Sequence, residues 1–108
     1  MREKDIQKAI IAELNKHPLV AWCYVTSAGR VQVGKYWMTL GFEGLSDIIG
    51  QIRSVGLIDG RLLAIEVKQP GKEPTPSQVE FLNKVRRNGG ISGVAHSVEE
   101  AMEIIYEM

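Results

Sequence analysis

The segment from Leu62 to Lys68 constrains the fold more than any other part of this chain. It reads Leu-Leu-Ala-Ile-Glu-Val-Lys, so apolar residues occupy both of its faces and two charged residues stand at its end. A short run of this kind is typical of a strand inside a sheet that is covered on both sides. Glu66 and Lys68 are two residues apart and therefore project from the same face. Charges beside a buried strand are costly unless they are paired, hydrogen-bonded or bound to a metal ion.

Helices and strands are predicted on both sides of this segment. Apolar spacing predicts a first helix, and two Ser/Thr-x-x-Glu/Gln patterns, at Thr75 and Ser97, mark the starts of two more. Runs rich in β-branched and aromatic residues predict strands, of which the second is expected to be the hairpin partner of the first through a turn over residues 27–30. We expect helices at residues 2–16, from Thr75 to Asn88 and from Ser97 onward, and strands at residues 20–26, 31–40, 47–53, 61–69 and 91–96.

These elements predict an α/β fold with a mixed sheet flanked by helices, in the order α-β-β-β-β-α-β-α. The last strand follows a helical crossover, so we expect it to lie parallel to the strand that contains Glu66. A chain of 108 residues has room for one modest core, and we therefore expect a single domain over residues 1–108.

Composition indicates the kind of cellular compartment in which the protein works. Only one cysteine, Cys23, is present, which excludes an internal disulfide and suits a reducing environment; we expect its side chain to be inert core. No apolar run approaches the ~18 residues of a membrane span, and the polar N-terminus does not resemble a signal peptide. The sequence thus predicts an intracellular protein that is neither secreted nor bound to a membrane.

The net charge of the chain is zero, but its charged residues are unevenly distributed along the sequence. Residues 61–90 carry six basic and three acidic groups, whereas residues 91–108 carry four glutamates and neither lysine nor arginine. The basic stretch also contains Glu66 and Lys68. It is either a solvated surface or a surface that meets phosphates, and the pattern alone does not choose between them.

Asp47 gives Glu66 a candidate partner, because it begins the preceding strand. Opposite Cβ atoms of an antiparallel pair lie ~4.5–5.5 Å apart, close enough for two carboxylates to share a cation. A two-residue turn at Asp59-Gly60 would place Arg53 opposite Glu66, whereas a longer loop over residues 54–59 places Asp47 there. We predict the longer loop.

The residue types in this constellation suggest a chemistry. Two carboxylates with no paired His or Cys favour Mg²⁺ or Mn²⁺ over zinc. Lys68 would hold or polarise a water molecule and offset charge on a phosphate. Asp47, Glu66 and Lys68 therefore predict a metal-dependent phosphodiesterase site.

The flanking segments narrow this prediction. Gly44-Leu45-Ser46-Asp47 is followed by the run from Ala64 to Gly71 and then by Ser77-Gln78 with Phe81-Leu82. In this order and spacing they resemble the virus-type replication-repair nuclease (VRR-NUC) family of the PD-(D/E)XK superfamily. The chain departs from the superfamily pattern at Ser46, where the proline of that name stands. This position shapes the backbone and supplies no ligand.

The resemblance implies a restriction-endonuclease-like fold and a DNA endonuclease that uses Mg²⁺ or Mn²⁺. It implies that Asp47 and Glu66 bind the metal together with the backbone carbonyl of Val67, and that Lys68 is catalytic. It also implies a homodimer that acts on branched DNA such as Holliday junctions, in DNA repair and in a phage or bacterial setting, in the cytoplasm or at the nucleoid. Two sites related by a two-fold axis suit a symmetric junction.

Two further site residues are less clearly marked. The first helix should supply another carboxylate; both Glu3 and Glu13 lie near its apolar stripe, and the family pattern favours Glu3. Glu3 could equally stabilise the positive end of that helix. Gln78 completes a capping box with Thr75, which is a structural role, but in the family a glutamine on this helix faces the active site.

Several residues have weaker interpretations. Lys72 lies in the loop beside the site and is the preferred phosphate contact. Arg86 and Arg87 lie further along the helix that contains Gln78 and could also meet phosphates. Tyr36 and Trp37 have aromatic rings that can stack on bases, although we expect them to pack inside the protein. The two histidines, His17 and His96, lack ligand-spaced partners and are expected to be solvated or capping groups.

Two other functions compete with the nuclease. One is a catalytically inactive nucleic-acid-binding module that retains the nuclease fold, against which the paired carboxylates argue. The other is an interaction domain that uses the acidic C-terminal helix, with Glu99, Glu100, Glu103 and Glu107 on its surface. That pattern is equally explained as the solvated face of an amphipathic helix.

Overall fold

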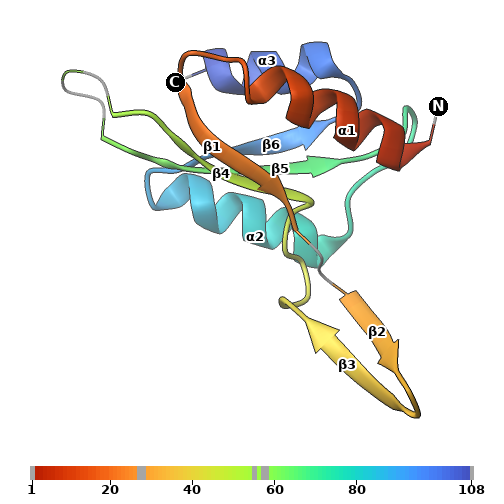
Figure 1. The fold of residues 1–108 in the computed structure, drawn as a ribbon. Coiled ribbons are helices and arrows are strands. Elements are labelled where there is room, and N and C mark those ends of the chain that lie inside the picture. Colours follow the sequence, from red (N-terminus) through yellow and green to blue (C-terminus); the bar gives the residue numbers. More distant parts are fainter. Residues whose placement is uncertain (1, 27–28, 55, 57–58, 108) are drawn as a thin grey trace.

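A computed structural model describes residues 2–26, 29–54, 56 and 59–107 of the chain. Within these residues the elements form a mixed α/β fold, which confirms the predicted class (Figure 1). The predicted loop over residues 54–59 and the predicted turn over residues 27–30 lie partly outside the described residues. The elements in chain order are α1 (Glu3–Leu14), β1 (Val20–Val25), β2 (Gly29–Val33), β3 (Tyr36–Leu40), β4 (Ile48–Ile52), β5 (Leu62–Val67), α2 (Pro76–Arg87), β6 (Ile91–Ala95) and α3 (Val98–Tyr106).

Four of the strands form the central sheet, in the order β1-β4-β5-β6. The β1–β4 and β4–β5 pairs are antiparallel, and β5 pairs with β6 in parallel. The chain crosses from β5 to β6 through α2, as a parallel pair requires. The predicted parallel arrangement of the last strand beside the Glu66 strand is therefore confirmed.

One predicted element is wrong. Residues 31–40 were expected to form a single strand paired with residues 20–26, but they contain the two strands β2 and β3, which pair with each other. The reason lies at Gly34-Lys35: Gly34 has a φ of +62°, and Val33 pairs with Tyr36, so these two residues form a tight hairpin turn. The observed order thus contains one strand more than predicted, and β1 pairs with β4 instead.

The helices cover the two faces of the sheet unequally (Figure 1). α1 and α3 pack side by side on one face, where the main core lies. α2 packs on the other face, but only over β5 and β6, where Ala64 meets Leu82 and Val85. The half of this face that β1 and β4 form is left without a helix, and Trp22 and Tyr24 on β1 are exposed there.

The local sequence explains why the helices begin where they do. In α1 the buried residues Ile6, Ile10 and Leu14 recur every four positions. At the start of α3 the Ser97 side chain accepts a hydrogen bond from the Glu100 backbone N–H, which is an ordinary N-cap. Among the helices that the structure describes, none combines the length and apolar character needed to cross a membrane.

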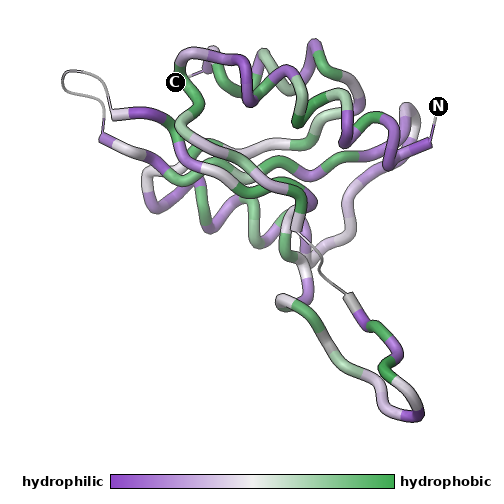
Figure 2. The backbone as a smooth tube through the Cα atoms, in the orientation of Figure 1, coloured by the Kyte–Doolittle hydropathy of each residue, from purple (hydrophilic) through white to green (hydrophobic). Residues whose placement is uncertain are grey.

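The β2–β3 hairpin projects away from the sheet and its helices (Figure 1). Figure 2 shows hydrophobic segments in the central strands between the helices and again along this hairpin. The expectation that Tyr36 and Trp37 pack inside the protein is wrong, because their side chains are 67% and 57% exposed.

Candidate active site

The register of β4 and β5 brings Asp47 to Glu66. Ile48 pairs with Ile65, and Gln51 with Leu62, so the position before Ile48 lies opposite Glu66. The Asp47 Oδ2 atom accepts a hydrogen bond of 2.9 Å from the backbone N–H of Val67. The predicted register is therefore confirmed, although Asp47 stands just before β4 and not within it.

The backbone around Asp47 is fixed by its neighbours. The backbone N–H of Thr26 donates to the Asp47 carbonyl at 2.7 Å, and the Thr26 hydroxyl donates to the Ser46 carbonyl at 2.6 Å. Ser46 itself is fully buried and its hydroxyl donates to the Ile48 carbonyl. Ser46 thus stabilises the turn into β4 by hydrogen bonding.

Glu66 is the most unusual ionisable group of the site. Its side chain is only 2% exposed, and Oε2 is buried without a hydrogen-bond partner among the described residues. Burial, followed by the contact with the Asp47 carboxyl and the charge of that group, raises the pKa of this carboxyl to about 9, whereas the charge of Lys68 opposes the shift. A buried acceptor oxygen with no donor is the environment that a bound cation would complete.

Lys68 follows β5 directly and is half-buried. Its backbone N–H donates to the Ala95 carbonyl, which extends the β5–β6 pairing by one step. Alternation along this strand places Lys68 on the same face as Glu66 and Ala64, the face that α2 covers. The side chain is close enough to Glu66 for its charge to lower the pKa of that carboxyl.

Gln78 contacts both Thr75 and Glu66, so its two interpretations do not exclude each other. Its Oε1 atom accepts from the Thr75 backbone N–H at 2.8 Å, and its backbone N–H donates to the Thr75 hydroxyl, which completes the capping box. Its Nε2 atom donates to Glu66 Oε1 at 3.2 Å. One amide therefore starts α2 and also orients the buried carboxyl.

The structure distinguishes the two glutamates of α1. Glu3, at the first position of the helix, is half-buried, and its charge contributes to the raised pKa of Glu66. Glu13 lies near the other end, is exposed and forms an ion pair of 3.9 Å with Lys16. Glu3 is thus the helix carboxylate within electrostatic range of the site.

Lys72 is tied to a residue whose role the sequence did not indicate. The Lys72 carbonyl lies 2.9 Å from His96 Nε2, and His96 Nδ1 lies 2.7 Å from Glu100 Oε1. His96 therefore connects the loop after β5 with the start of α3. The contact between His96 and Glu100 could have been predicted, because the two residues are four positions apart. The contact between His96 and Lys72 joins residues far apart in the sequence and leaves no pattern in it.

The other predicted groups lie apart from Glu66. Arg86 and Arg87 are exposed at the end of α2, about 12 Å along the helix axis from Gln78, and Arg86 donates to the Ser92 carbonyl. His17 accepts from the Leu19 backbone N–H, the capping role expected of it. Cys23 is buried in the core, as predicted, and burial raises its pKa.

Asp47 and Glu66 are the carboxylates that this site offers to a divalent cation. No group of three or more His, Cys, Asp and Glu side chains suited to a metal is present in the part of the chain that the structure describes. Mg²⁺, however, is commonly bound through one or two carboxylates, with waters and substrate phosphates completing its shell. The facing Asp47 and Glu66, with one orphaned oxygen between strand and helix, fit such a cation.

Comparison with models of known protein families, and with curated proteins, finds no match for this chain.

Proposed function

We propose that this chain is a metal-dependent nuclease that hydrolyses phosphodiester bonds in DNA. The observation that carries the proposal is the Glu66 carboxyl, which is buried with an unpartnered oxygen directly opposite Asp47. A protein that needed only a stable sheet would lose free energy by burying an acid there. A bound cation would offset the free energy lost by burying the Glu66 carboxyl.

In this proposal Asp47 and Glu66 hold the cation together with the backbone carbonyl of Val67. When bound, Mg²⁺ or Mn²⁺ would supply positive charge for the phosphate oxygens and lower the pKa of water. Gln78 keeps Glu66 in place through the hydrogen bond to Oε1. Glu3 would support the site from α1, either through a water molecule or through its charge.

Lys68 has a distinct role in the same reaction. Hydrolysis forms a bond between a water oxygen and phosphorus, breaks the bond from phosphorus to one ester oxygen, and moves a water proton away, ultimately to the departing oxygen. The Lys68 ammonium would orient the water and place its charge beside the phosphate oxygens as negative charge develops.

The DNA itself would meet basic groups around the site. Lys72 lies in the loop that follows Lys68, and Arg86 and Arg87 lie further along α2. Their spacing suits contacts to phosphates that flank the one being cut. The resemblance to VRR-NUC enzymes supports branched DNA as the substrate and a homodimer as the active form.

The proposal is tested by incubating the purified chain with end-labelled linear and four-way-junction DNA, in Mg²⁺ or Mn²⁺ and in EDTA. We expect cleavage that requires the metal. Glu66→Gln and Lys68→Ala should each reduce the rate by at least ~100-fold, the range that a lost catalytic group typically costs.

Glu103→Gln and Lys84→Ala are the matched controls, since both remove the same charges from exposed helix positions and should leave cleavage unchanged. Absence of metal-dependent cleavage on every DNA would overturn the proposal. Tight DNA binding without cleavage would identify the inactive binding module instead.

A further inference from the structure

The β2–β3 hairpin, residues 29–40, carries two pairs of a cation and an aromatic ring. The Arg30 guanidinium lies 4.9 Å from the centre of the Trp37 ring, and the Lys35 ammonium lies 5.7 Å from the centre of the Tyr36 ring. All four side chains are exposed to solvent. The two rings thus contribute nothing to the core, and the site around Glu66 does not use them.

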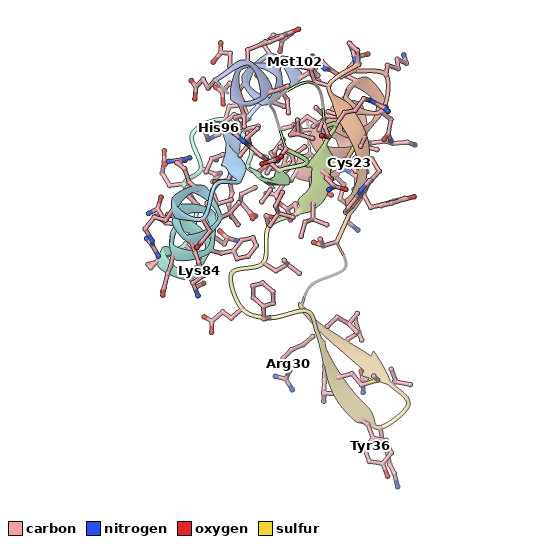
Figure 3. All side chains as sticks on the ribbon, turned by 90° about the vertical axis from the view of Figure 1, so that its left-hand side faces the viewer. Cys23, Arg30, Tyr36, Lys84, His96 and Met102 are labelled. Carbon is pink, nitrogen blue, oxygen red and sulfur yellow. The ribbon has the colours of Figure 1, made fainter. Side chains whose placement is uncertain are left out.

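The two pairs lie on opposite faces of the hairpin. Gln32 pairs with Trp37, and Arg30 stands two residues before Gln32, so alternation places Arg30 on the Trp37 face. Tyr36 follows the turn that contains Lys35 and points to the other face. Figure 3 shows Tyr36 at the end of the hairpin and Arg30 nearer to the sheet. Each face therefore presents one open ring beside one positive charge.

The charge of the hairpin differs from that of the whole chain. The chain has equal numbers of basic and acidic residues, but the segment from Thr26 to Phe42 contains two basic residues and no acidic one. The other exposed side chains on the hairpin are largely apolar: Val31, Val33 and Met38. This segment is thus a local positive surface with exposed rings, which is complementary to a polyanion that also carries flat aromatic groups.

Unpaired nucleotides match this combination. Each nucleotide supplies one phosphate and one base, as each face of the hairpin supplies one cation and one ring. In a duplex the bases are stacked and offer only their edges to a protein, so a protein ring can stack on a base only where the strand is unpaired. A protein partner would instead have to remove water from both cations, which costs free energy unless its own acids pair with them.

The base of the hairpin is held beside the candidate active site. On one side the Thr26 backbone N–H donates to the Asp47 carbonyl at 2.7 Å. On the other side the Phe42 ring packs edge-on against Phe81 of α2, with ring centres 5.2 Å apart. A nucleic acid strand that lies along the hairpin therefore leads toward Asp47 and its partner Glu66.

We propose that the hairpin binds unpaired nucleotides of the DNA substrate, with bases stacked on Tyr36 and Trp37 and phosphates against Lys35 and Arg30. The inference rests on the proposed function, which identifies the nucleic acid as DNA. It adds the feature of the substrate that the hairpin selects, a single-stranded stretch next to the bond that is cut. The four side chains bind substrate and take no part in the chemical step.

The test is fluorescence anisotropy in EDTA, where binding is measured without cleavage. The probes are a labelled oligothymidylate of about 12 nucleotides and a blunt duplex of the same length. Tyr36→Leu and Trp37→Leu should each raise the dissociation constant for the oligothymidylate at least ~5-fold, the low end of the effect of one lost stacked base. Neither substitution should change the affinity for the duplex.

Conservative variants distinguish stacking from simple packing. Tyr36→Phe and Trp37→Phe keep a flat ring and should retain the affinity that the leucine variants lose. Lys35→Gln should reduce the slope of log K against log salt by about 0.7, the value for one phosphate contact to a single strand. Tyr106→Leu is the matched control, because Tyr106 on α3 is 69% exposed, as Tyr36 is at 67%, and lies off the hairpin. It should bind as the parent chain does.

Trp37 also gives a direct signal. The chain has two tryptophans, Trp22 and Trp37, so Trp22→Phe leaves Trp37 as the only indole. Stacking on a base quenches indole fluorescence, and saturating oligothymidylate should therefore lower the emission of this variant. Emission that does not change although the oligonucleotide binds would overturn the stacking contact.

Other outcomes would also reject the proposal. They are the absence of oligothymidylate binding, equal affinities of the leucine and phenylalanine variants, and a dimer that Tyr36→Leu dissociates while DNA binding is unchanged; the last would assign the hairpin to a second copy. Circular dichroism verifies that each variant is folded. Cleavage in Mn²⁺ is measured separately: stacking without cleavage rejects only the nuclease, whereas cleavage with no effect of the leucine variants on binding rejects only the role of the hairpin.

Discussion

Among single residues, Gln78 is the one that connects a helix start to a buried acid. Its amide oxygen caps α2 through the Thr75 backbone N–H, while its amide nitrogen donates to Glu66. These bonds use different atoms of the same group, so a substitution can remove one and keep the other. The sequence showed both possibilities as alternatives because spacing alone does not indicate that one side chain reaches in both directions.

Gln78→Glu should separate the two functions. The carboxylate still accepts from Thr75, so the unfolding free energy linked to the cap should be retained, whereas it cannot donate to Glu66 and adds a third acid beside it. Gln78→Ala also loses the side-chain bond to the Thr75 backbone N–H, while its own backbone N–H still donates to the Thr75 hydroxyl, and it should cost a further ~0.5–1.5 kcal/mol. Urea unfolding of the two variants without metal measures this difference; equal stability would show that the capping bond contributes nothing.

His96 provides a pH-dependent contact at the residue scale. Both of its ring nitrogens face acceptors, the Glu100 carboxylate and the Lys72 carbonyl, so the ring satisfies both only when it is doubly protonated. Hydrogen bonds to Glu100 and Lys72, with the nearby charge of Glu73, raise the pKa of His96 above 6.5. Hydrogen bonds from His96 lower the pKa of Glu100 below 4.5.

The direction of the pH effect follows from these shifts. The stability due to His96 is complete below its ordinary pKa of 6.5 and is lost as pH rises through the raised value. The stability due to Glu100 is complete above 4.5 and is lost as pH falls through the lowered value. Coupling between the two should thus be greatest between pH 4.5 and 6.5.

A double-mutant cycle with His96→Gln and Glu100→Gln measures this coupling by urea unfolding. We expect about 0.5–1 kcal/mol near pH 5.5, because the pair is partly exposed, and a smaller value near pH 9. A coupling that stays constant across this range would contradict the charged contact.

Among the elements, the segment before β4 lies unusually close to the start of α2. Gly44 has a φ of +90°, and a Cβ atom there would lie 2.4 Å from the Ser77 carbonyl oxygen. Only glycine allows this conformation and this proximity together. Since Asp47 and Gln78 follow these two positions, the close approach holds the two segments that supply partners to Glu66 next to each other.

Gly44→Ala should therefore destabilise the protein by about 1–3 kcal/mol more than a glycine replacement that meets no atoms. Gly89→Ala is the matched control: its φ is also +90°, but nothing lies within 4 Å of the added carbon. Cleavage should fall only in Gly44→Ala, as Gln78 is displaced from Glu66. Equal stability loss in both variants would mean that the clash is relieved without cost.

The sheet was largely predictable from the sequence, and the hairpin was not. The apolar run of β5 and the crossover through α2 predict a central strand and its parallel neighbour, and the choice of loop length correctly placed Asp47 opposite Glu66. For residues 31–40, alternation predicts a strand but gives no information about its partner, and it continues across Gly34-Lys35 without marking the turn there. Tyr36 and Trp37 are exposed although aromatic residues are buried on average, because residue type alone does not indicate that their strands project from the sheet.

For the whole molecule, binding of the proposed cation should measurably increase the free energy of unfolding. A ligand at 100 times its dissociation constant adds about 2.7 kcal/mol to the unfolding free energy, which corresponds to a rise of about 10 °C or more in the melting temperature of a chain of this size. The rise is measured as the difference between the melting temperatures in Mn²⁺ and in EDTA.

Glu66→Gln should abolish this rise, because an amide does not replace a carboxylate as a ligand, and the metal-free variant should be at least as stable as the parent chain. Lys68→Ala should retain the rise while losing cleavage. Loss of the Mn²⁺ effect in Lys68→Ala but not in Glu66→Gln would reverse the roles assigned to the two residues.

The hydrogen bond between the Thr26 backbone N–H and the Asp47 carbonyl has a consequence for how such a chain can change over evolution. The chain leaves the sheet at one of these residues and returns at the other, so the segment between them is closed at its base. Because the entropy of closing a loop varies only slowly with its length, the hairpin within this segment, residues 29–40, can be shortened, extended or replaced while Gly44 stays against α2 and Asp47 stays opposite Glu66. Relatives with the same carboxylate pair would then diverge most in the hairpin, where a grafted sequence would be tolerated best.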